Sequence, residues 1–139
     1  MIKGISHLTF SVSDLAASAA FYQQVFDAVL LFQSEQTAYF DLAGLWLALN
    51  VQTDIGRQEI RQSYTHIAFE ADAADMAAME RRLQRLGIPL VPGRSREAAE
   101  GLSLYFTDPD GHLLEVHAGS RETRINSYQT HANIPSAEK

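Results

Sequence analysis

The sequence predicts an α+β fold made of paired βαβββ modules within a single domain of residues 1–139. One observation is the order of elements, because a strand-like segment, an amphipathic helix and further strand-like segments follow one another in both halves of the chain. The other is a repeated pattern, since His7-Leu-Thr-Phe-Ser-Val in the first half matches His66-Ile-Ala-Phe-Glu-Ala in the second. Such a repeat indicates modules at about residues 1–50 and 64–118, followed by a tail at residues 119–139.

In the first half, a helix is predicted over Asp14 to Asp27, because Ser13 and Asp14 can cap it and apolar residues recur at helical spacing. Three short apolar segments of this half predict strands by their content of branched and aromatic residues. These strands are Ile5–Val12, Thr37–Leu42 and Leu45–Asn50.

In the second half, a helix is predicted over Asp75 to Leu86, where four apolar residues form one stripe. Gly87 ends it, and Pro89 follows just beyond. The segment Pro92 to Gly101 is expected to be a loop, and one or two helical turns are expected around Arg121–Tyr128. The predicted strands are Tyr64–Phe69, Ser103–Thr107 and Leu113–His117.

Composition excludes several classes of function. The chain has 139 residues, of which 46% are hydrophobic, enough for one buried core. Its net charge of −6 argues against nucleic-acid binding, which calls for a basic surface. No apolar run approaches the roughly 20 residues of a membrane span, and no signal peptide follows Met1, so we expect a cytoplasmic protein without a membrane partner. The absence of cysteine excludes disulfides, thiolate metal ligands and a cysteine nucleophile.

Alternate residues of a strand share a face, and here one face of each strand carries polar and aromatic side chains. An antiparallel sheet that exposes its polar face to water would show the same alternation. The presence of His, Tyr and Trp favours instead a curved sheet that wraps these faces around a cavity. The residues that share these faces are His7 with Thr9, Trp46 with Asn50, Tyr64 with His66, Ser103 with Tyr105, and Glu115 with His117.

A metal site is the chemistry that these faces favour. His7 and His66 occupy matching positions of the repeat, and with Glu115 they would offer two imidazoles and one carboxylate, leaving coordination positions open. Spacing alone does not decide between Glu115 and His117, because both lie on the same face. An isolated histidine is more often an ordinary core or surface residue. His112 and His131 are expected to be exposed and to have no role.

These residues resemble the vicinal oxygen chelate superfamily and, within it, the fosfomycin-resistance metallothiol transferases. The resemblance runs from Met1 to about Tyr128. Its most specific motifs include Arg57-Gln-Glu-Ile-Arg-Gln-Ser-Tyr-Thr-His66, and Tyr105-Phe-Thr-Asp-Pro-Asp-Gly-His-Leu-Leu-Glu115 closes the second half. It implies curved mixed sheets around a divalent cation, typically Mn²⁺, with Mg²⁺ or another divalent cation as alternatives. It also implies a homodimer, in which His7 of one subunit completes a site with His66 and Glu115 of the other.

The resemblance further implies an enzyme that opens the epoxide of fosfomycin by adding a thiol. Arginines suit the phosphonate of this substrate, because they make bidentate charged hydrogen bonds. Some relatives have an additional glutamate ligand in the first half, but the repeat aligns Glu115 with Ala48, so that ligand is absent here. By resemblance the catalytic residues are Thr9, Tyr64 and Tyr105, and the substrate-binding residues are Tyr39, Trp46, Asn50, Arg94 and Arg124.

The nucleophile is predicted from positions at which the branches of the resembled family differ from one another. Thr9 stands where several bacillithiol-using members have Cys and glutathione-using members have Thr. The loop Gly93 to Gly101 does not reproduce the K⁺-binding loop of the glutathione branch, so no K⁺ site is predicted. The glutamate of the hydrolytic branch aligns at about Thr37, with Glu35 two residues earlier. The resemblance therefore favours bacillithiol, with L-cysteine as a poorer substitute.

Other functions stay open at this point. The nucleophile could be glutathione or water. The chain could also be an isomerase or dioxygenase that acts on another metal-chelating substrate, or a non-catalytic protein of the same fold that sequesters a drug.

Overall fold

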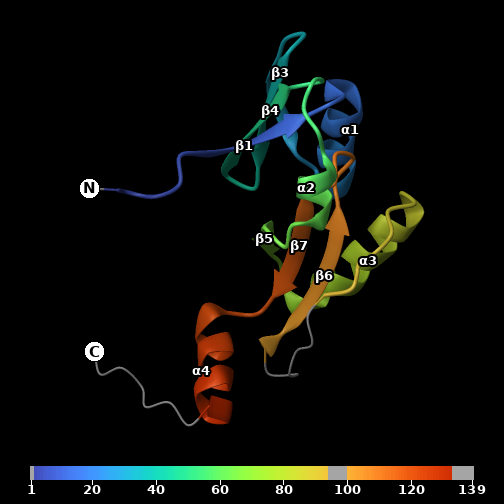
Figure 1. Cartoon of the computed structure of the whole chain (residues 1–139). Coiled ribbons are helices and arrows are strands. Elements are labelled where there is room, and N and C mark those ends of the chain that lie inside the picture. Colours follow the sequence, from blue (N-terminus) through green and yellow to red (C-terminus); the bar gives the residue numbers. More distant parts are fainter. Residues whose placement is uncertain (1, 94–99, 133–139) are drawn as a thin grey trace. The chain divides into compact units, whose positions relative to one another are not determined.

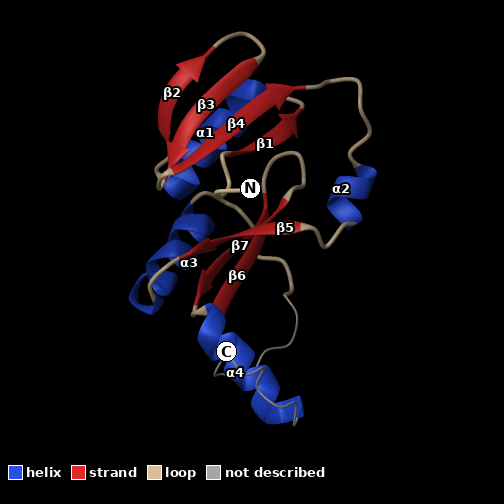
Figure 2. Cartoon of the chain, turned by 90° about the vertical axis from the view of Figure 1, so that its left-hand side faces the viewer, coloured by secondary structure: helices blue, strands red, loops and turns tan. Residues whose placement is uncertain are grey.

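The computed structural model describes residues 2–93 and 100–132, and it has the predicted α+β fold, with a four-stranded and a three-stranded sheet (Figures 1 and 2). The chain divides into two compact units. The first comprises residues 1–64 and 108–112, and the second comprises residues 65–107 and 113–139. The turn at residues 108–112 therefore belongs to the first unit, although the strands on either side of it belong to the second.

The first unit contains a sheet of order β1-β4-β3-β2, in which β1 and β4 are parallel and the other pairs are antiparallel. Helix α1 begins after Asp14, whose side chain accepts a hydrogen bond from the Ala17 amide at 2.9 Å, and it ends at Asp27, which has the left-handed φ of 55°. The elements are β1 (His7–Val12), α1 (Leu15–Phe26), β2 (Val29–Gln33), β3 (Thr37–Leu42), β4 (Leu45–Val51) and α2 (Gln58–Gln62).

The second unit contains a sheet of order β5-β7-β6, with β5 parallel and β6 antiparallel to the central strand β7. Helix α3 buries Met76 and Leu83, as its apolar stripe predicts. The elements are β5 (His66–Glu70), η1 (Ala73–Asp75), α3 (Met76–Arg85), β6 (Leu102–Thr107), β7 (Leu113–Ala118) and α4 (Arg121–Ala132).

The cores of the two units lie on the aliphatic faces of their strands. In the first unit Phe40, Leu47 and Leu49 are fully buried with Tyr22 and Val25 of α1. In the second unit Phe106 and Leu114 are fully buried, as is Leu83 of α3. The predicted alternation of faces is therefore confirmed in the strands that carry these residues, and each sheet keeps its other face for polar and aromatic side chains.

The strand registers show how closely the two halves correspond. Thr9 lies opposite Ala48 between β1 and β4, and Ala68 lies opposite Glu115 between β5 and β7. The first strand of each unit thus pairs in parallel with its partner at the same offset, and Ala48 and Glu115 occupy equivalent positions. This correspondence is the physical form of the repeat seen in the sequence.

Several elements differ from the sequence-based expectation, among them β2, α2 and α4. Strand β2 at Val29–Gln33 is absent from the sequence-based predictions. Its apolar residues do not alternate with polar ones, its register shifts between Leu30 and Phe32, and all five residues are exposed. The five-residue helix α2 was also not predicted. Helix α4 extends to Ala132, beyond the turns expected around Arg121–Tyr128. None of the described helices has the length and apolar character to cross a membrane.

The described part of the second unit has no full counterpart of β2. Its β6 edge, which corresponds to the β3 edge that β2 occupies, accepts a backbone hydrogen bond from Val91. The Val91 amide donates a hydrogen bond to the Tyr105 carbonyl oxygen at 2.8 Å. A single bond of this kind marks the place of the outer strand without forming a ladder.

Candidate functional site

One face of the first unit's sheet gathers five of the predicted site residues. The register pairs His7 with Trp46 and Thr9 with Ala48, and directly paired residues point to the same side of a sheet. Across β3, Tyr39 pairs with Ala48 and so joins this face. The ring of Trp46 lies 4.8 Å from that of His7 and 5.4 Å from that of Tyr39, and Trp46 remains 42% exposed.

At the end of the same face, Thr37 and Asn50 form a polar pair. The Thr37 hydroxyl lies 2.5 Å from Asn50 Oδ1 and 3.0 Å from the Leu49 carbonyl oxygen. Thr37 is the position at which the hydrolytic branch is expected to have a glutamate. A threonine hydroxyl bound in this way offers no carboxylate to activate water.

The second unit brings together two of the three predicted metal ligands. His66 begins β5 and Glu115 lies in the middle of β7, and Nε2 of the imidazole is 3.1 Å from Oε2 of the carboxylate. Glu115 is 1% exposed, and the ring of the buried Tyr105 lies 5.8 Å from His66 in an edge-on arrangement. His7 belongs to the first unit, so its convergence with this pair remains a prediction.

His117 takes a different role from Glu115, although both lie on one face of β7. Its Nδ1 is 2.8 Å from the Ser103 hydroxyl, and its Nε2 is 3.0 Å from Nη2 of Arg124. Both ring nitrogens of His117 therefore have partners, whereas Glu115 lies beside His66. The two side chains therefore have different partners, and the assignment of Glu115 as a metal ligand stays a prediction.

Arg124 is placed by the start of helix α4. Ser120 and Thr123 bind each other reciprocally, because the Thr123 amide donates to Ser120 Oγ at 3.1 Å and the Ser120 amide donates to Thr123 Oγ1 at 3.2 Å. This is the pattern of a capping box, and it starts the helix at Arg121. The first turn then directs Arg124 back toward β7, and Nη2 of Arg124 lies 3.8 Å from Glu115 Oε1.

Two further predicted residues lie elsewhere. Strand β5 begins at His66, so Tyr64 lies in the segment before the strand and is 56% exposed. The expectation that Tyr64 lies within this strand was wrong. Arg94 lies outside the described residues.

This chain is similar over most of its length to a known superfamily and to named proteins. The model of the Glyoxalase/Bleomycin resistance protein/Dioxygenase superfamily matches residues 4–116. The metallothiol transferase FosB of Bacillus licheniformis is 52% identical over 128 residues, covering 92% of this chain and 83% of that protein. The FosB of Shouchella clausii is 51% identical over 130 residues, covering 93% of this chain and 89% of that protein. The chain belongs to the FosB metallothiol transferase family.

Solved structures agree with the family and confirm the fold predicted from the sequence. The fosfomycin resistance protein FosX of Listeria monocytogenes, in a complex with Mn(II) and 1S,2S-dihydroxypropylphosphonic acid, matches with a TM-score of 0.83 and 38% identity, over 92% of this chain and 99% of that chain. FosX of Mesorhizobium loti matches with a TM-score of 0.75 and 37% identity, over 90% of this chain and 99% of that chain. The vicinal oxygen chelate fold is thus shared with fosfomycin resistance proteins.

The donor atoms of this FosB family member suit a divalent cation. Two ligand atoms at adjacent corners of an octahedron, each about 2.1 Å from an ion, lie about 3 Å apart. Nε2 of His66 and Oε2 of Glu115, one imidazole nitrogen and one carboxylate oxygen, meet this spacing at 3.1 Å. Within neither unit do three or more described His, Cys, Asp or Glu side chains gather as a metal site. The pair therefore fits a cation that takes further donors from elsewhere.

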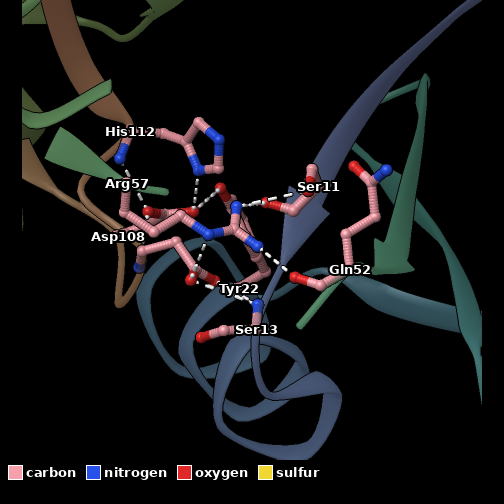
Figure 3. A network of polar contacts seen from close by, with 8 residues as sticks. Ser11, Ser13, Tyr22, Gln52, Arg57, Asp108 and His112 are labelled. Atoms are coloured by element: carbon pink, nitrogen blue, oxygen red, sulfur yellow. Dashed lines mark hydrogen bonds and ion pairs between the residues drawn. The ribbon is translucent and has the colours of Figure 1, made fainter. Parts of the chain in front are cut away.

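The first unit also contains a polar network around Arg57, Asp108 and Asp110 that the sequence pattern does not predict (Figure 3). Arg57 donates to the carbonyl oxygens of Ser11 at 2.7 Å and Gln52 at 2.6 Å, and its Nε lies 3.5 Å from Asp110. Asp110 is 2% exposed and accepts hydrogen bonds from the Ser13 amide at 3.1 and 3.0 Å. These contacts fasten the turn that leads into β7, the strand that carries Glu115.

His112 belongs to this network, so the expectation that it would be exposed was wrong. Its Nδ1 lies 2.9 Å from Asp108 Oδ2, and its ring stacks on Phe10 at 4.6 Å. The hydroxyl of Tyr22 donates to the same Asp108 oxygen at 3.0 Å. Burial, with the charge of Asp108 next in importance, raises the pKa of Tyr22 well above its usual value, so this hydroxyl keeps its proton. The side chain of His131 lies outside the described residues.

Proposed function

We propose that this chain is a metal-dependent thiol transferase that inactivates fosfomycin by opening its epoxide with a low-molecular-weight thiol. Membership in the FosB family supports the reaction class. The single observation that carries the proposal is the buried Glu115 beside His66, with Tyr105 and Arg124 next to them in the same unit. These side chains combine donors for a cation with a guanidinium for an anion, as a phosphonate bound to a metal requires.

The proposed metal ligands are His66 and Glu115 of one subunit and His7 of the partner copy in a homodimer. Mn²⁺ is the proposed ion, because FosX of Listeria monocytogenes binds Mn(II), and Mg²⁺ is the alternative. When bound, the ion would supply Lewis-acid stabilisation, several kcal/mol in magnitude, to the oxygen that gains charge as the epoxide opens. The chain itself would contribute the imidazole nitrogens of His7 and His66 and the carboxylate of Glu115.

The phosphonate and the epoxide are assigned to different residues. Arg124, with Arg94, is proposed to hold the phosphonate through charged hydrogen bonds. Hydroxyl groups of Thr9, Tyr64 and Tyr105 are proposed to donate hydrogen bonds to substrate oxygens. The remaining pocket residues are Tyr39, Trp46 and Asn50, which lie on the first unit's polar face.

The proposed nucleophile is bacillithiol, with L-cysteine as a poorer substitute. The chain has no cysteine, so the attacking sulfur comes from the cosubstrate. Water is disfavoured because Thr37, which is hydrogen-bonded to Asn50, stands where the hydrolytic branch has its water-activating glutamate. Glutathione is the remaining thiol candidate, without a K⁺ site. A cytoplasmic location, where such thiols are kept reduced, belongs to the same proposal.

One experiment tests this proposal directly. Purified protein with Mn²⁺ and fosfomycin would be incubated separately with bacillithiol, L-cysteine, glutathione and no thiol, and the products analysed by NMR and mass spectrometry. We expect a thioether adduct that forms fastest with bacillithiol. A diol formed from water would contradict the transferase assignment, and a preference for glutathione would contradict only the cosubstrate. Fosfomycin binding without turnover, by a protein free of metal, would favour a sequestering function instead.

A further inference from the structure

A chain of four side chains runs through the second unit from Arg124 to Glu115. Nη2 of Arg124 is 3.0 Å from His117 Nε2, and His117 Nδ1 is 2.8 Å from Ser103 Oγ. The Ser103 hydroxyl is 2.6 Å from Glu115 Oε1. His117 is 8% and Glu115 1% exposed, so these bonds lie in an environment where polar groups must be paired.

The chemistry of the groups fixes the direction of every bond. Arginine only donates, so Nε2 of His117 accepts, and the ring hydrogen must lie on Nδ1 of a neutral imidazole. At the other end, the Glu115 carboxylate only accepts, so Ser103 gives it its single hydroxyl hydrogen. Ser103 Oγ must then accept from His117 Nδ1–H. The two ends of the chain independently require the same tautomer of His117.

The strand register explains why this arrangement occurs. Ser103 lies opposite His117 and Tyr105 lies opposite Glu115 between β6 and β7. At the equivalent positions of the first unit, Thr37 lies opposite Asn50 and is also hydrogen-bonded to it. Both halves thus pair a hydroxyl with a nitrogen-bearing side chain. Only the second half has a carboxylate two residues before that side chain, where the first half has Ala48.

We propose that Ser103 and His117 are positioning residues of the site. Ser103 holds Oε1 of Glu115, which leaves Oε2 facing His66, and His117 ties this arrangement to Arg124. The inference rests on the proposed function, in which Glu115 binds the metal and Arg124 the phosphonate. Gly119 supports it sterically, because a Cβ at this position would lie 2.8 Å from His117 Nε2. Because Gly119 has no side chain, the His117 imidazole has room to accept the hydrogen bond from Arg124.

Removing the hydroxyl of Ser103 tests the first half of the inference. Ser103→Ala is expected to weaken Mn²⁺ binding by about 10- to 100-fold, the usual effect of losing a residue that orients a metal ligand. Ser103→Thr keeps the hydroxyl, as Thr37 does in the first unit, and is expected to restore most of the affinity. Binding would be measured by electron paramagnetic resonance of free Mn²⁺.

The matched control is Ser18→Ala. Ser18 is also buried, but its hydroxyl has no hydrogen-bond partner among the described residues, so this variant is expected to bind Mn²⁺ as the wild type does. Thermal unfolding would confirm that each variant is folded. Wild-type affinity in folded Ser103→Ala would overturn the inference.

Two substitutions of His117 separate its two bonds. Asparagine can place a donor near the Nδ1 position but does not reach Arg124, so His117→Asn is expected to keep Mn²⁺ affinity and raise KM for fosfomycin more than it lowers kcat. Glutamine reaches the Nε2 position but lacks the donor to Ser103, so His117→Gln is expected to lose Mn²⁺ affinity first. Identical losses in both variants would indicate a merely structural role and would overturn the assignment.

The tautomer provides a readout that needs neither metal nor activity. The ¹⁵N spectrum of the histidine side chains is expected to show the ring hydrogen of His117 on Nδ1, with Nε2 as the acceptor. A hydrogen on Nε2 would overturn the inference even in an active enzyme. A wild-type protein that binds no Mn²⁺ would instead overturn the proposed function, and the positioning role with it.

Discussion

Glu115 illustrates the chemistry of this chain at the scale of single residues. A carboxylate that is 1% exposed would be strongly destabilising without partners, since isolated buried charges cost many kcal/mol. Its partners come from three other elements: His66 from β5, Ser103 from β6 and Arg124 from α4. The residue therefore lies among polar partners from both other strands of its sheet and from α4, as a buried carboxylate requires.

Two substitutions in this group are expected to separate metal binding from phosphonate binding. His66→Ala removes a proposed ligand and should weaken Mn²⁺ binding by more than about 100-fold, because losing even a supporting residue costs 10- to 100-fold. Arg124→Ala should keep most of the Mn²⁺ affinity and raise KM for fosfomycin by about 10- to 100-fold, the effect of one charged hydrogen bond. Mn²⁺ titration and steady-state kinetics measure the two effects. Full metal binding by His66→Ala would show that the ligand set is wrong.

The raised pKa of Tyr22 leads to a second prediction at this scale, which concerns the free energy of unfolding in alkaline solution. Its pKa is raised in the folded protein, whereas in the unfolded chain it is about 10. As the pH rises above about 10, the unfolded chain loses this proton first, so the free energy of unfolding falls by about 1.4 kcal/mol per pH unit until the native group also ionises. The contribution of Tyr22 is fully present below that pH.

Tyr22→Phe is expected to lack this part of the pH dependence and to be less stable at pH 7 by about 2 kcal/mol, because Asp108 loses a hydrogen-bond donor. Urea unfolding at pH 7 to 10.5 measures both effects. Tyr128→Phe is the control, since Tyr128 is 46% exposed. An unchanged alkaline slope in Tyr22→Phe would contradict the assignment.

At the scale of elements, the ends of β6 and β7 depend on a close backbone approach. Gly101 precedes β6 with φ +85°, and a Cβ there would lie 2.0 Å from the Ala118 carbonyl oxygen at the end of β7. Gly44 has the same φ of +85° in the turn between β3 and β4, with nothing within 4 Å of an added Cβ. The two positions share the same φ and differ in what surrounds them.

This pair gives a matched prediction for stability. Gly44→Ala should cost about 1–2 kcal/mol, the usual penalty of a left-handed conformation for a residue with a Cβ. Gly101→Ala should cost clearly more, because the Ala118 backbone would also have to move. Urea midpoints of both variants measure the difference. Equal losses of stability would mean that β6 and β7 separate at this end without cost.

At the scale of the whole molecule, the homodimer is the part of the proposal that can be tested most sharply. If His7 of one subunit completes the site of the other, a heterodimer of His7→Ala and His66→Ala subunits contains one site with all its ligands. Refolding equal amounts of the two variants together should then recover about a quarter of wild-type sites, because half of randomly paired dimers are mixed and each has one intact site of two. Turnover of fosfomycin and bound Mn²⁺ report the recovery.

The control for this mixture uses two variants of the same half-site. His66→Ala and Glu115→Ala each damage the second-unit ligands, so no combination of their subunits restores a site. Activity in this control, or none in the first mixture, would argue against a site shared between subunits.

The sequence by itself determined the fold class, the positions of α1, α3 and most strands, and the polar faces that carry His7, His66 and Glu115. These features follow from periodicity and from an internal repeat, which are local properties of the chain. The unpredicted β2 lacks that periodicity, because its residues are exposed on both faces at the edge of the sheet.

Only the tertiary structure decided which polar side chains are partners. The bonds of Tyr22 to Asp108 and of Ser13 to Asp110 span 86 and 97 residues, and nothing in the local pattern predicts such pairings. The different hydrogen-bond partners of Glu115 and His117 likewise depend on side-chain directions set by Ser103 and by the start of α4. Strand alternation places residues on a face, whereas packing of distant segments determines which atoms on that face meet.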